Sequence, residues 1–228
     1  LPVCLGRATK VCDLLTDKDK EYEAVMLLGM TTDTQDVSGN VLSRQEVTVS
    51  EDAVKTVIAS FEGEYMQIPP MYSALKVDGK KLYELAREGK TVERKPRAVQ
   101  FYEIEIKKIE LPYVRFSVTC SKGTYIRTLC HDIGQKLGCG GCMEELLRTR
   151  SGNFVWEDSM TLAQVEEAVR NGTIGDRVIR IGQVLKDYPE IFCTREGDRL
   201  LENGNTLAER FVRGEHKEGW VRMCDSQG

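Results

Sequence analysis

Residues 121–128 place an aromatic ring and a guanidinium two positions apart, directly after a turn. The sequence Ser-Lys-Gly-Thr-Tyr-Ile-Arg-Thr begins with residues that favour a turn. If the chain is extended after Gly123, Tyr125 and Arg127 leave the same face of a strand. A ring beside a guanidinium can stack on a base and pair with a carboxylate. A half-exposed sheet face has the same spacing, so this segment alone leaves both interpretations open.

Two groups of residues could hold a metal. Asp33 and Asp36 are three positions apart, but a calcium loop needs more oxygen ligands at closer spacing, and side-chain-to-backbone turns explain them as well. Cys139 and Cys142 form a Cys-x-x-Cys pair after a Cys-His at 130–131. A zinc nucleoside deaminase would need H-x-E and P-C-x-x-C, and a redox pair would need a strand-then-helix setting. We therefore predict no metal, with a zinc domain as an alternative that elemental analysis would decide.

The chain from residue 68 onward predicts a protruding basic arm. It opens with Ile-Pro-Pro-Met-Tyr-Ser-Ala-Leu-Lys, and residues 76–97 carry eight basic and four acidic side chains within a chain of net charge −4. Leu82, Leu85 and Ala86 share a weakly apolar helical face. An arm with one apolar and one basic side suits an RNA clamp, although a protein-docking arm or a solvated charged face fits the same composition.

Apolar periodicity predicts strands and helices without regular alternation, which is typical of an α+β fold. The predicted elements are a strand at 22–28, a helix capped by Ser50 that ends before Gly63, a strand at 114–119, a helix at 129–137 that ends at Gly138, and a helix opened by a Thr161-x-x-Gln164 capping box and closed by Gly172. The sequence predicts a connection with one short helix at 177–189. It predicts a turn-rich, strand-like module at 190–228.

The composition is that of a globular protein, with 228 residues, 41% apolar and 30% charged. No apolar run approaches the roughly 18 residues of a membrane helix, and no signal peptide is recognisable. A cytoplasmic protein with reduced thiols fits the eight scattered cysteines. The chain begins at Leu1 and stops at Gly228 in stretches that resemble the interior of elements, so we expect a fragment.

Seven motifs follow one another along nearly the whole chain. They are LPVCLGRATK at 1–10, DK-x-Y at 19–22, LG-x-x-TDT-x-D at 28–36, IPPMYSALK at 68–76, GKKLY at 79–83, CSKGTYIR at 120–127, and LGCG with LLRTRSG within 137–152. In this order they resemble the bacterial tRNA pseudouridine-55 synthases, the TruB family. The basic arm resembles the bacterial members rather than the guide-RNA-dependent archaeal and eukaryotic relatives.

The resemblance implies a mixed, largely antiparallel central sheet with flanking helices over residues 1–186, with an RNA-clamping thumb at about 70–97. Residues 187–228 would form a small, incomplete, β-rich PUA-like module. The implied reaction isomerises uridine 55 in the T arm of tRNA. The base is flipped out, its N-glycosidic bond is broken, the base turns, and C5 is joined to the ribose. No cofactor or metal is implied, and the partner is the tRNA T stem-loop, bound by a monomer with no obligate protein partner.

The resemblance also implies roles for single residues. Tyr22 would pack against the flipped base and help remove the C5 proton, Tyr125 would contact base or sugar, and Leu146 would line the pocket. Arg127 would hold the catalytic carboxylate, with Asp36 positioning Arg127. The implied RNA-contacting residues are Lys20, Lys76, Lys80, Lys81 and Arg87.

The nucleophile of the family lies in a Gly-x-Leu-Asp-Pro stretch directly upstream of the segment that matches residues 1–10. The printed sequence contains no such stretch, nor the family's upstream histidine. We therefore expect these 228 residues alone to bind tRNA weakly and to turn over nothing. Carboxylate attack at C6 of the base and at C1′ of the ribose both stay open. A non-catalytic RNA-binding or RNA-folding module with the same pocket is the alternative function.

Overall fold

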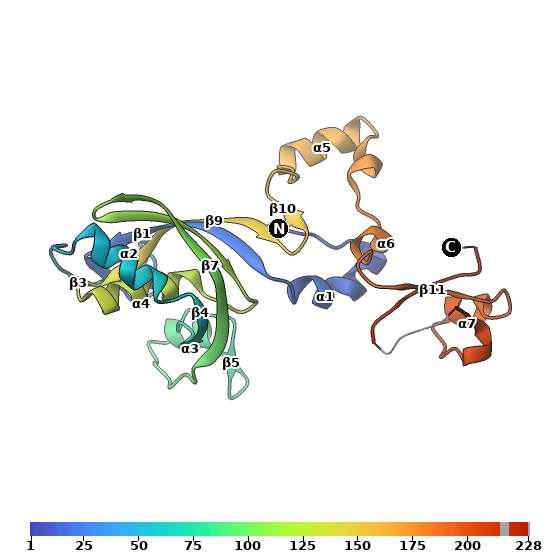
Figure 1. Cartoon of the computed structure of the whole chain (residues 1–228), viewed down its shortest axis with the longest axis horizontal. Helices are drawn as coiled ribbons and strands as arrows, with labels where there is room; N and C mark the ends of the chain where they lie inside the picture. The colour runs from blue at the N-terminus through green and yellow to red at the C-terminus, as the bar shows by residue number, and fades with distance from the viewer. Residues whose placement is uncertain (215–218, 228) are drawn as a thin grey trace. The chain divides into compact units, whose positions relative to one another are not determined.

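Two compact units make up the chain, Leu1–Ser159 and Met160–Gly228. The computed structural model in Figure 1 describes residues 1–214 and 219–227. The sequence placed the boundary between the catalytic domain and the PUA-like module near residue 186, which is later than the division by compactness. That functional boundary stays a prediction.

The first unit is built on a six-stranded antiparallel sheet. Its strand order is β10 (Phe154–Val155), β9 (Gly141–Ser151), β1 (Lys20–Leu28), β8 (Tyr113–Cys120), β7 (Arg97–Glu110) and β4 (Gly63–Gln67). With the helices below, this confirms the predicted α+β class and the antiparallel central sheet.

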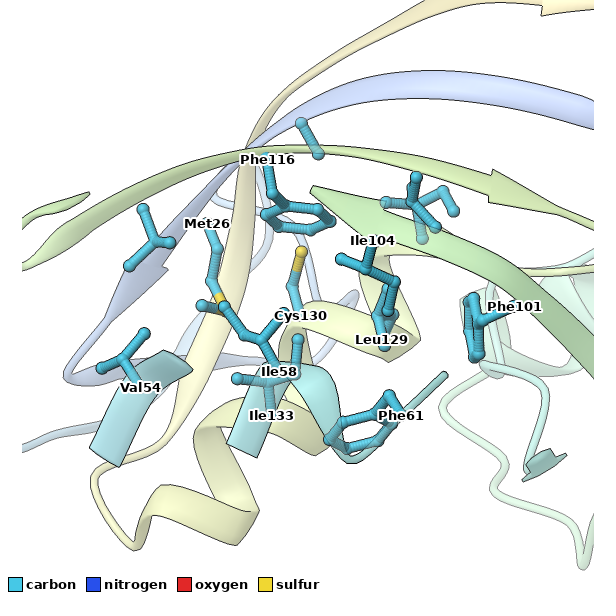
Figure 2. Packing of buried hydrophobic residues seen from close by; sticks show 14 of the residues in the cluster. Met26, Val54, Ile58, Phe61, Phe101, Ile104, Phe116, Leu129, Cys130 and Ile133 are labelled. Atoms are coloured by element: carbon cyan, nitrogen blue, oxygen red, sulfur yellow. The ribbon is translucent and has the colours of Figure 1, made fainter. Parts of the chain in front are cut away.

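One face of the sheet is covered by α2 (Glu51–Ala59) and α4 (Ile126–Leu137). The alternation predicted for residues 114–119 produces this asymmetry, because Val114, Phe116 and Val118 are fully buried while their neighbours face the other side. Figure 2 shows side chains of the sheet and of both helices meeting in one core: Met26, Phe116, Ile58, Leu129 and Ile133.

Helix α2 begins, and helix α4 ends, where the sequence predicts. The Ser50 hydroxyl accepts the Ala53 N–H at 3.2 Å, at the N-terminus of α2. Helix α4 ends at Gly138, whose φ of +78° belongs to the left-handed region that glycine tolerates.

The start of α4 differs from the prediction. The helix begins at Ile126, so Tyr125 is its N-cap and Arg127 lies in its first turn. The expectation that Tyr125 and Arg127 leave the same face of a strand is therefore wrong. The apolar spacing explains the error, since Ile126, Leu129 and Ile133 are all buried on one helical face.

The predicted arm leaves the sheet between β4 and β7. It contains the hairpin of β5 (Lys76–Val77) and β6 (Lys80–Lys81), followed by α3 (Leu82–Arg87). The hairpin turns through Asp78 and Gly79, with φ values of +50° and +83°. A small cluster of Met71, Leu82 and Leu85, separate from the main core, confirms the apolar face of the arm.

The remaining elements are short. In the first unit they are a 3-10 helix at Gly6–Val11, α1 (Cys12–Thr16), and the pair of β2 (Met30–Thr32) and β3 (Val41–Arg44). The second unit holds α5 (Leu162–Arg170), 3-10 helices at Ile174–Arg177 and Glu209–Phe211, α6 (Ile181–Val184), α7 (Asp198–Glu202), and a sheet of order β12 (Val212–Arg213), β11 (Glu190–Cys193), β13 (Arg222–Cys224).

The second unit contains the capping box and the short strands that its sequence predicts. Thr161 and Gln164 form the predicted capping box, with the Thr161 hydroxyl accepting the Gln164 N–H at 3.3 Å and Gln164 Oε1 accepting the Thr161 N–H at 2.8 Å. The three short strands match the small β-rich module expected after residue 187, of which 215–218 and 228 lie outside the described residues. Among the residues that are described, no helix is long and apolar enough to cross a membrane.

Candidate active site

One end of the six-stranded sheet gathers most of the candidate residues. Because the strands are antiparallel, the start of β1 lies beside the ends of β8 and β9, with Lys20 paired to both Cys120 and Ser151. Phe101, near the start of β7, also pairs with Cys120. The turn into α4 and the basic arm both leave from this end, so residues far apart in the sequence meet there.

Tyr22 lies near the start of β1, between Val118 of β8 and Arg148 of β9. Its ring packs partly buried against the main core. Burial raises the pKa of the Tyr22 phenol, against a smaller opposing effect of Arg148. The phenol is therefore neutral at neutral pH, where it offers a flat surface and a hydroxyl donor. Its role in removing the C5 proton stays a prediction.

Leu146 and Arg148 extend this surface along β9. They pair with Ala24 and Tyr22, and directly opposed residues of an antiparallel pair project to the same face. Leu146 is 42% exposed, so an open apolar side chain stands on the sheet face that carries Tyr22. The sequence analysis predicts no role for Arg148. Its position two residues after Leu146 on the same strand indicates that both side chains share a face.

Lys20 adds a second cation at this end of the sheet. Its ammonium donates to the carbonyl oxygens of Thr16 and Lys18, both at 2.5 Å. Burial, followed by the positive charge of Arg148, lowers the pKa of Lys20. Two neighbouring cations beside Tyr22 favour an anionic ligand such as a phosphate or a carboxylate.

Tyr125 is fixed by an amide pair with Gln67, the last residue of β4. Gln67 Oε1 accepts the Tyr125 N–H at 2.9 Å, and Gln67 Nε2 donates to the Tyr125 carbonyl at 3.1 Å. Gln67 is only 1% exposed. No local sequence pattern predicts this contact, because it joins residues 58 positions apart.

Arg127 points its guanidinium toward the root of the arm, where Nη2 donates to the Tyr72 carbonyl at 2.7 Å. The carboxylate of Asp36 instead accepts the N–H and hydroxyl of Ser38, at 3.0 and 2.7 Å. Among the described residues, no hydrogen bond or ion pair joins Asp36 to Arg127. The positioning role of Asp36 stays a prediction.

Gln35 connects the loop of Asp36 to α4. Its side-chain oxygen accepts the Thr128 hydroxyl at 2.7 Å, and its carbonyl accepts the Met143 N–H at 3.0 Å. Gln35 has a φ of +61°, which is uncommon for a residue with a side chain. The loop is thus fastened next to Arg127 by a residue that the sequence pattern did not single out.

The arm carries a basic face around one tyrosine. Lys76 and Lys81 are paired across the β5–β6 hairpin, and Lys81 Nζ donates to the Tyr83 hydroxyl at 3.2 Å. Lys81 Nζ and the Arg87 guanidinium both lie 5.4 Å from the centre of the Tyr83 ring. Lys80 is partly neutralised by Glu88, at 3.6 Å. Two lysines at paired positions suit a polyanion such as a phosphate backbone.

The cysteines that would hold zinc under the alternative hypothesis are buried. Cys130, Cys139 and Cys142 are each at most 5% exposed, and burial raises the pKa of Cys142 to about 11. At this pKa the Cys142 thiol is protonated at neutral pH. Within residues 1–214 and 219–227, no three His, Cys, Asp or Glu side chains are grouped to hold a metal ion.

Two family models match the chain. Residues 1–126 match the TruB family pseudouridylate synthase N-terminal domain, and residues 127–186 match the tRNA pseudouridylate synthase B C-terminal domain. The border between the two models falls at the start of α4, inside the first compact unit.

Curated relatives named tRNA pseudouridine synthase B are similar over most of the chain. The protein from Clostridium novyi is 47% identical over 210 residues, which are 92% of this chain and 71% of that protein. The protein from Lachnoclostridium phytofermentans is 51% identical over 217 residues, again 92% and 71%. The protein from Syntrophus aciditrophicus is 40% identical over 100% of this chain and 75% of its own length.

Solved structures with the same fold include a Cbf5–Nop10–Gar1 complex, with a TM-score of 0.72 and 29% identity over 100% of this chain. An H/ACA RNP bound to a substrate RNA containing 2′-deoxyuridine has a TM-score of 0.67 and 26% identity over 98% of this chain. This chain covers 62% and 60% of those two solved chains.

Proposed function

The chain belongs to the TruB family of pseudouridylate synthases, and from that premise we propose that it forms the base pocket and RNA clamp of an enzyme that isomerises uridine 55 of tRNA. The observation that carries the proposal is that Tyr22, the N-terminus of α4 and the basic arm lie at one end of one sheet, with Leu146 further along β9 on the face that carries Tyr22. An aromatic surface, an open apolar side chain and a basic arm are what an enzyme needs to extract a base from an RNA loop.

The side chains divide the work of the reaction. Tyr22 and Leu146 would hold the flipped uracil, and the nearby cations Lys20 and Arg148 would hold its phosphate. Arg127 would keep the family's catalytic carboxylate ionised and aimed. The isomerisation breaks the bond from C1′ to N1 and forms one from C1′ to C5; C5 loses a proton and N1 gains one. Attack at C6 and attack at C1′ both agree with this balance.

The T stem-loop of tRNA is the proposed ligand of the arm, and a monomer in the cytoplasm the proposed state. The relatives named tRNA pseudouridine synthase B support a tRNA substrate. Lys76, Lys81 and Arg87 supply the positive charge that a phosphate backbone requires.

A non-catalytic RNA-binding module is the second candidate. It would use the same arm and pocket without chemistry, so binding experiments on this chain do not separate the two. The difference lies in whether an aspartate supplied in a Gly-x-Leu-Asp-Pro stretch produces turnover.

Base extraction can be tested with a T stem-loop RNA that carries 2-aminopurine next to uridine 55. We expect its fluorescence to rise when the chain binds, because a flipped neighbour unstacks the probe. Leu146→Ala should reduce this rise, while Leu147→Ala should not. Leu147 is comparably exposed, at 37%, but pairs with Glu23 and faces the other side of the sheet. Equal loss in both variants, or no rise with the unaltered chain, would overturn the proposed pocket.

A further inference from the structure

The Gln67–Tyr125 pair joins two parts of the proposed site that have different tasks. Gln67 is the last residue of β4 and directly precedes the arm. Tyr125 is the N-cap of α4, two residues before Arg127. The Tyr125 carbonyl also accepts the N–H groups of Thr128 and Leu129, both at 3.1 Å. The side chain of Gln67 therefore bonds the same carbonyl on which the first turn of α4 closes.

Two further hydrogen bonds lie at the same root. Arg127 donates to the Tyr72 carbonyl at 2.7 Å, and Arg94, near the returning end of the arm, donates to the Pro69 carbonyl at 3.1 Å. Pro69, Pro70 and Met71 are buried, whereas Lys80 and Arg87 of the arm are exposed. The basic tip of the arm is exposed and its root is buried. A movement of the tip can therefore be transmitted to α4 through the few hydrogen bonds at the root.

We propose that Gln67 is a positioning residue that couples the RNA-gripping arm to the first turn of α4, and thereby sets Arg127. The arm would close on the RNA stem, its root would shift, and the Gln67 amide would carry this shift to Tyr125. Arg127 would then be aimed only when the arm has engaged RNA. The meaning of this coupling rests on the proposed function, but its existence can be measured without RNA.

The chemistry of position 67 accounts for glutamine there. The primary amide of Gln67 presents its carbonyl oxygen and one of its two N–H groups to Tyr125, the same acceptor and donor pair that a peptide group offers across a β-ladder. Leucine of similar size would leave the Tyr125 N–H without its Gln67 acceptor, and glutamate would place a second acceptor against the Tyr125 carbonyl.

The test is a double-mutant cycle read by hydrogen exchange at the Thr128 and Leu129 amides. Leu82→Ala loosens the arm by opening its own cluster, which is separate from the main core. As the sole substitution, Leu82→Ala should speed exchange at both amides by about tenfold, because coupled elements open together. In a Gln67→Leu background, Leu82→Ala should add less than about twofold.

Tyr65→Phe is the matched control. The Tyr65 hydroxyl donates to Asp132 at 2.9 Å, so it also ties β4 to α4, but away from the root of the arm. In the Tyr65→Phe background, Leu82→Ala should keep its full effect. Slow exchange of the Phe116 amide in β8 shows in every variant that the core stays folded, and Leu85→Ala replaces Leu82→Ala if the arm cluster collapses.

Equal acceleration in all three backgrounds, or none in the unaltered chain, would overturn the coupling. Addition of a T stem-loop RNA separates this result from the proposed function. Protection of Thr128 and Leu129 by the RNA, lost in Gln67→Leu but kept in Tyr65→Phe, would support both. Coupling in the free chain without any effect of the RNA would uphold the inference and count against the proposed ligand.

Discussion

The opposed lysines of the arm lead to a quantitative prediction about RNA binding. Lys76 and Lys81 are paired across the β5–β6 hairpin, and we expect each of them to contact a phosphate of the RNA. We consider the double variant Lys76→Gln/Lys81→Gln, which removes two positive charges and keeps the length of both side chains close to the original. Arg87, which lies over the Tyr83 ring, is left unchanged in this variant.

The expected loss follows from counterion release. Each contact to a duplex phosphate contributes about 0.9 to the slope of log affinity against log salt, so losing two contacts to the RNA stem lowers the slope by about 1.8. At about 0.1 M salt this corresponds to a loss of roughly 60-fold in affinity, or about 2.4 kcal/mol. Fluorescence anisotropy of a labelled T stem-loop RNA over a salt series measures both quantities.

The control variant is Lys55→Gln/Lys108→Gln, which changes the net charge equally. Lys55 lies in α2 and is paired with Asp52, and Lys108 lies in β7, paired with Glu110. Its salt slope should equal that of the unaltered chain. If both double variants lower the slope equally, overall charge rather than the arm governs binding, and the RNA clamp is refuted.

Three further predictions concern the core and the titrating groups. Burial raises the pKa of Asp132 despite the Tyr65 hydrogen bond. The folded state therefore binds the carboxyl proton more tightly than the unfolded state does. The stability that this group contributes is lost as pH rises through its folded-state pKa. Asp132→Asn should therefore raise Tm at neutral pH, and a gain that does not shrink as pH falls below the unfolded pKa would contradict this. The phenolate absorbance of Tyr22, isolated as the difference from Tyr22→Phe, should appear above the ordinary tyrosine pKa of 10.0; titration at or below it would remove burial as the dominant effect. Phe116→Ala should cost about 3–5 kcal/mol in urea unfolding, because the ring is fully buried in the main core; a loss below about 1 kcal/mol would contradict that packing.

Local patterns predicted the elements well wherever burial is periodic. The alternation at 114–119 and the caps at Ser50 and Thr161 lie within a few residues of the elements that they define. The same reasoning started the helix of Arg127 too late, because Ile126 was counted with an extended segment rather than with the buried face of α4.

Contacts between distant segments could not be predicted from local patterns. The Gln67–Tyr125 pair and the Arg127–Tyr72 hydrogen bond depend on how β4, the arm and α4 meet at one end of the sheet. Nothing in the composition of residues 60–75 indicates that the Gln67 side chain forms hydrogen bonds with the backbone of Tyr125, 58 positions away. Arg148 could have been found from Leu146, because residues two apart on a strand share a face, but no strand was predicted there.

Tritium release from tRNA labelled at uridine C5 tests the central claim most directly. The assay compares the 228-residue chain alone with the same chain joined, upstream of Leu1, to a Gly-x-Leu-Asp-Pro stretch of the family. We predict release only from the joined chain, and its loss when the added aspartate becomes alanine. Release by the 228 residues alone, or none from a joined chain that binds the T stem-loop, would contradict a pocket that depends on this carboxylate.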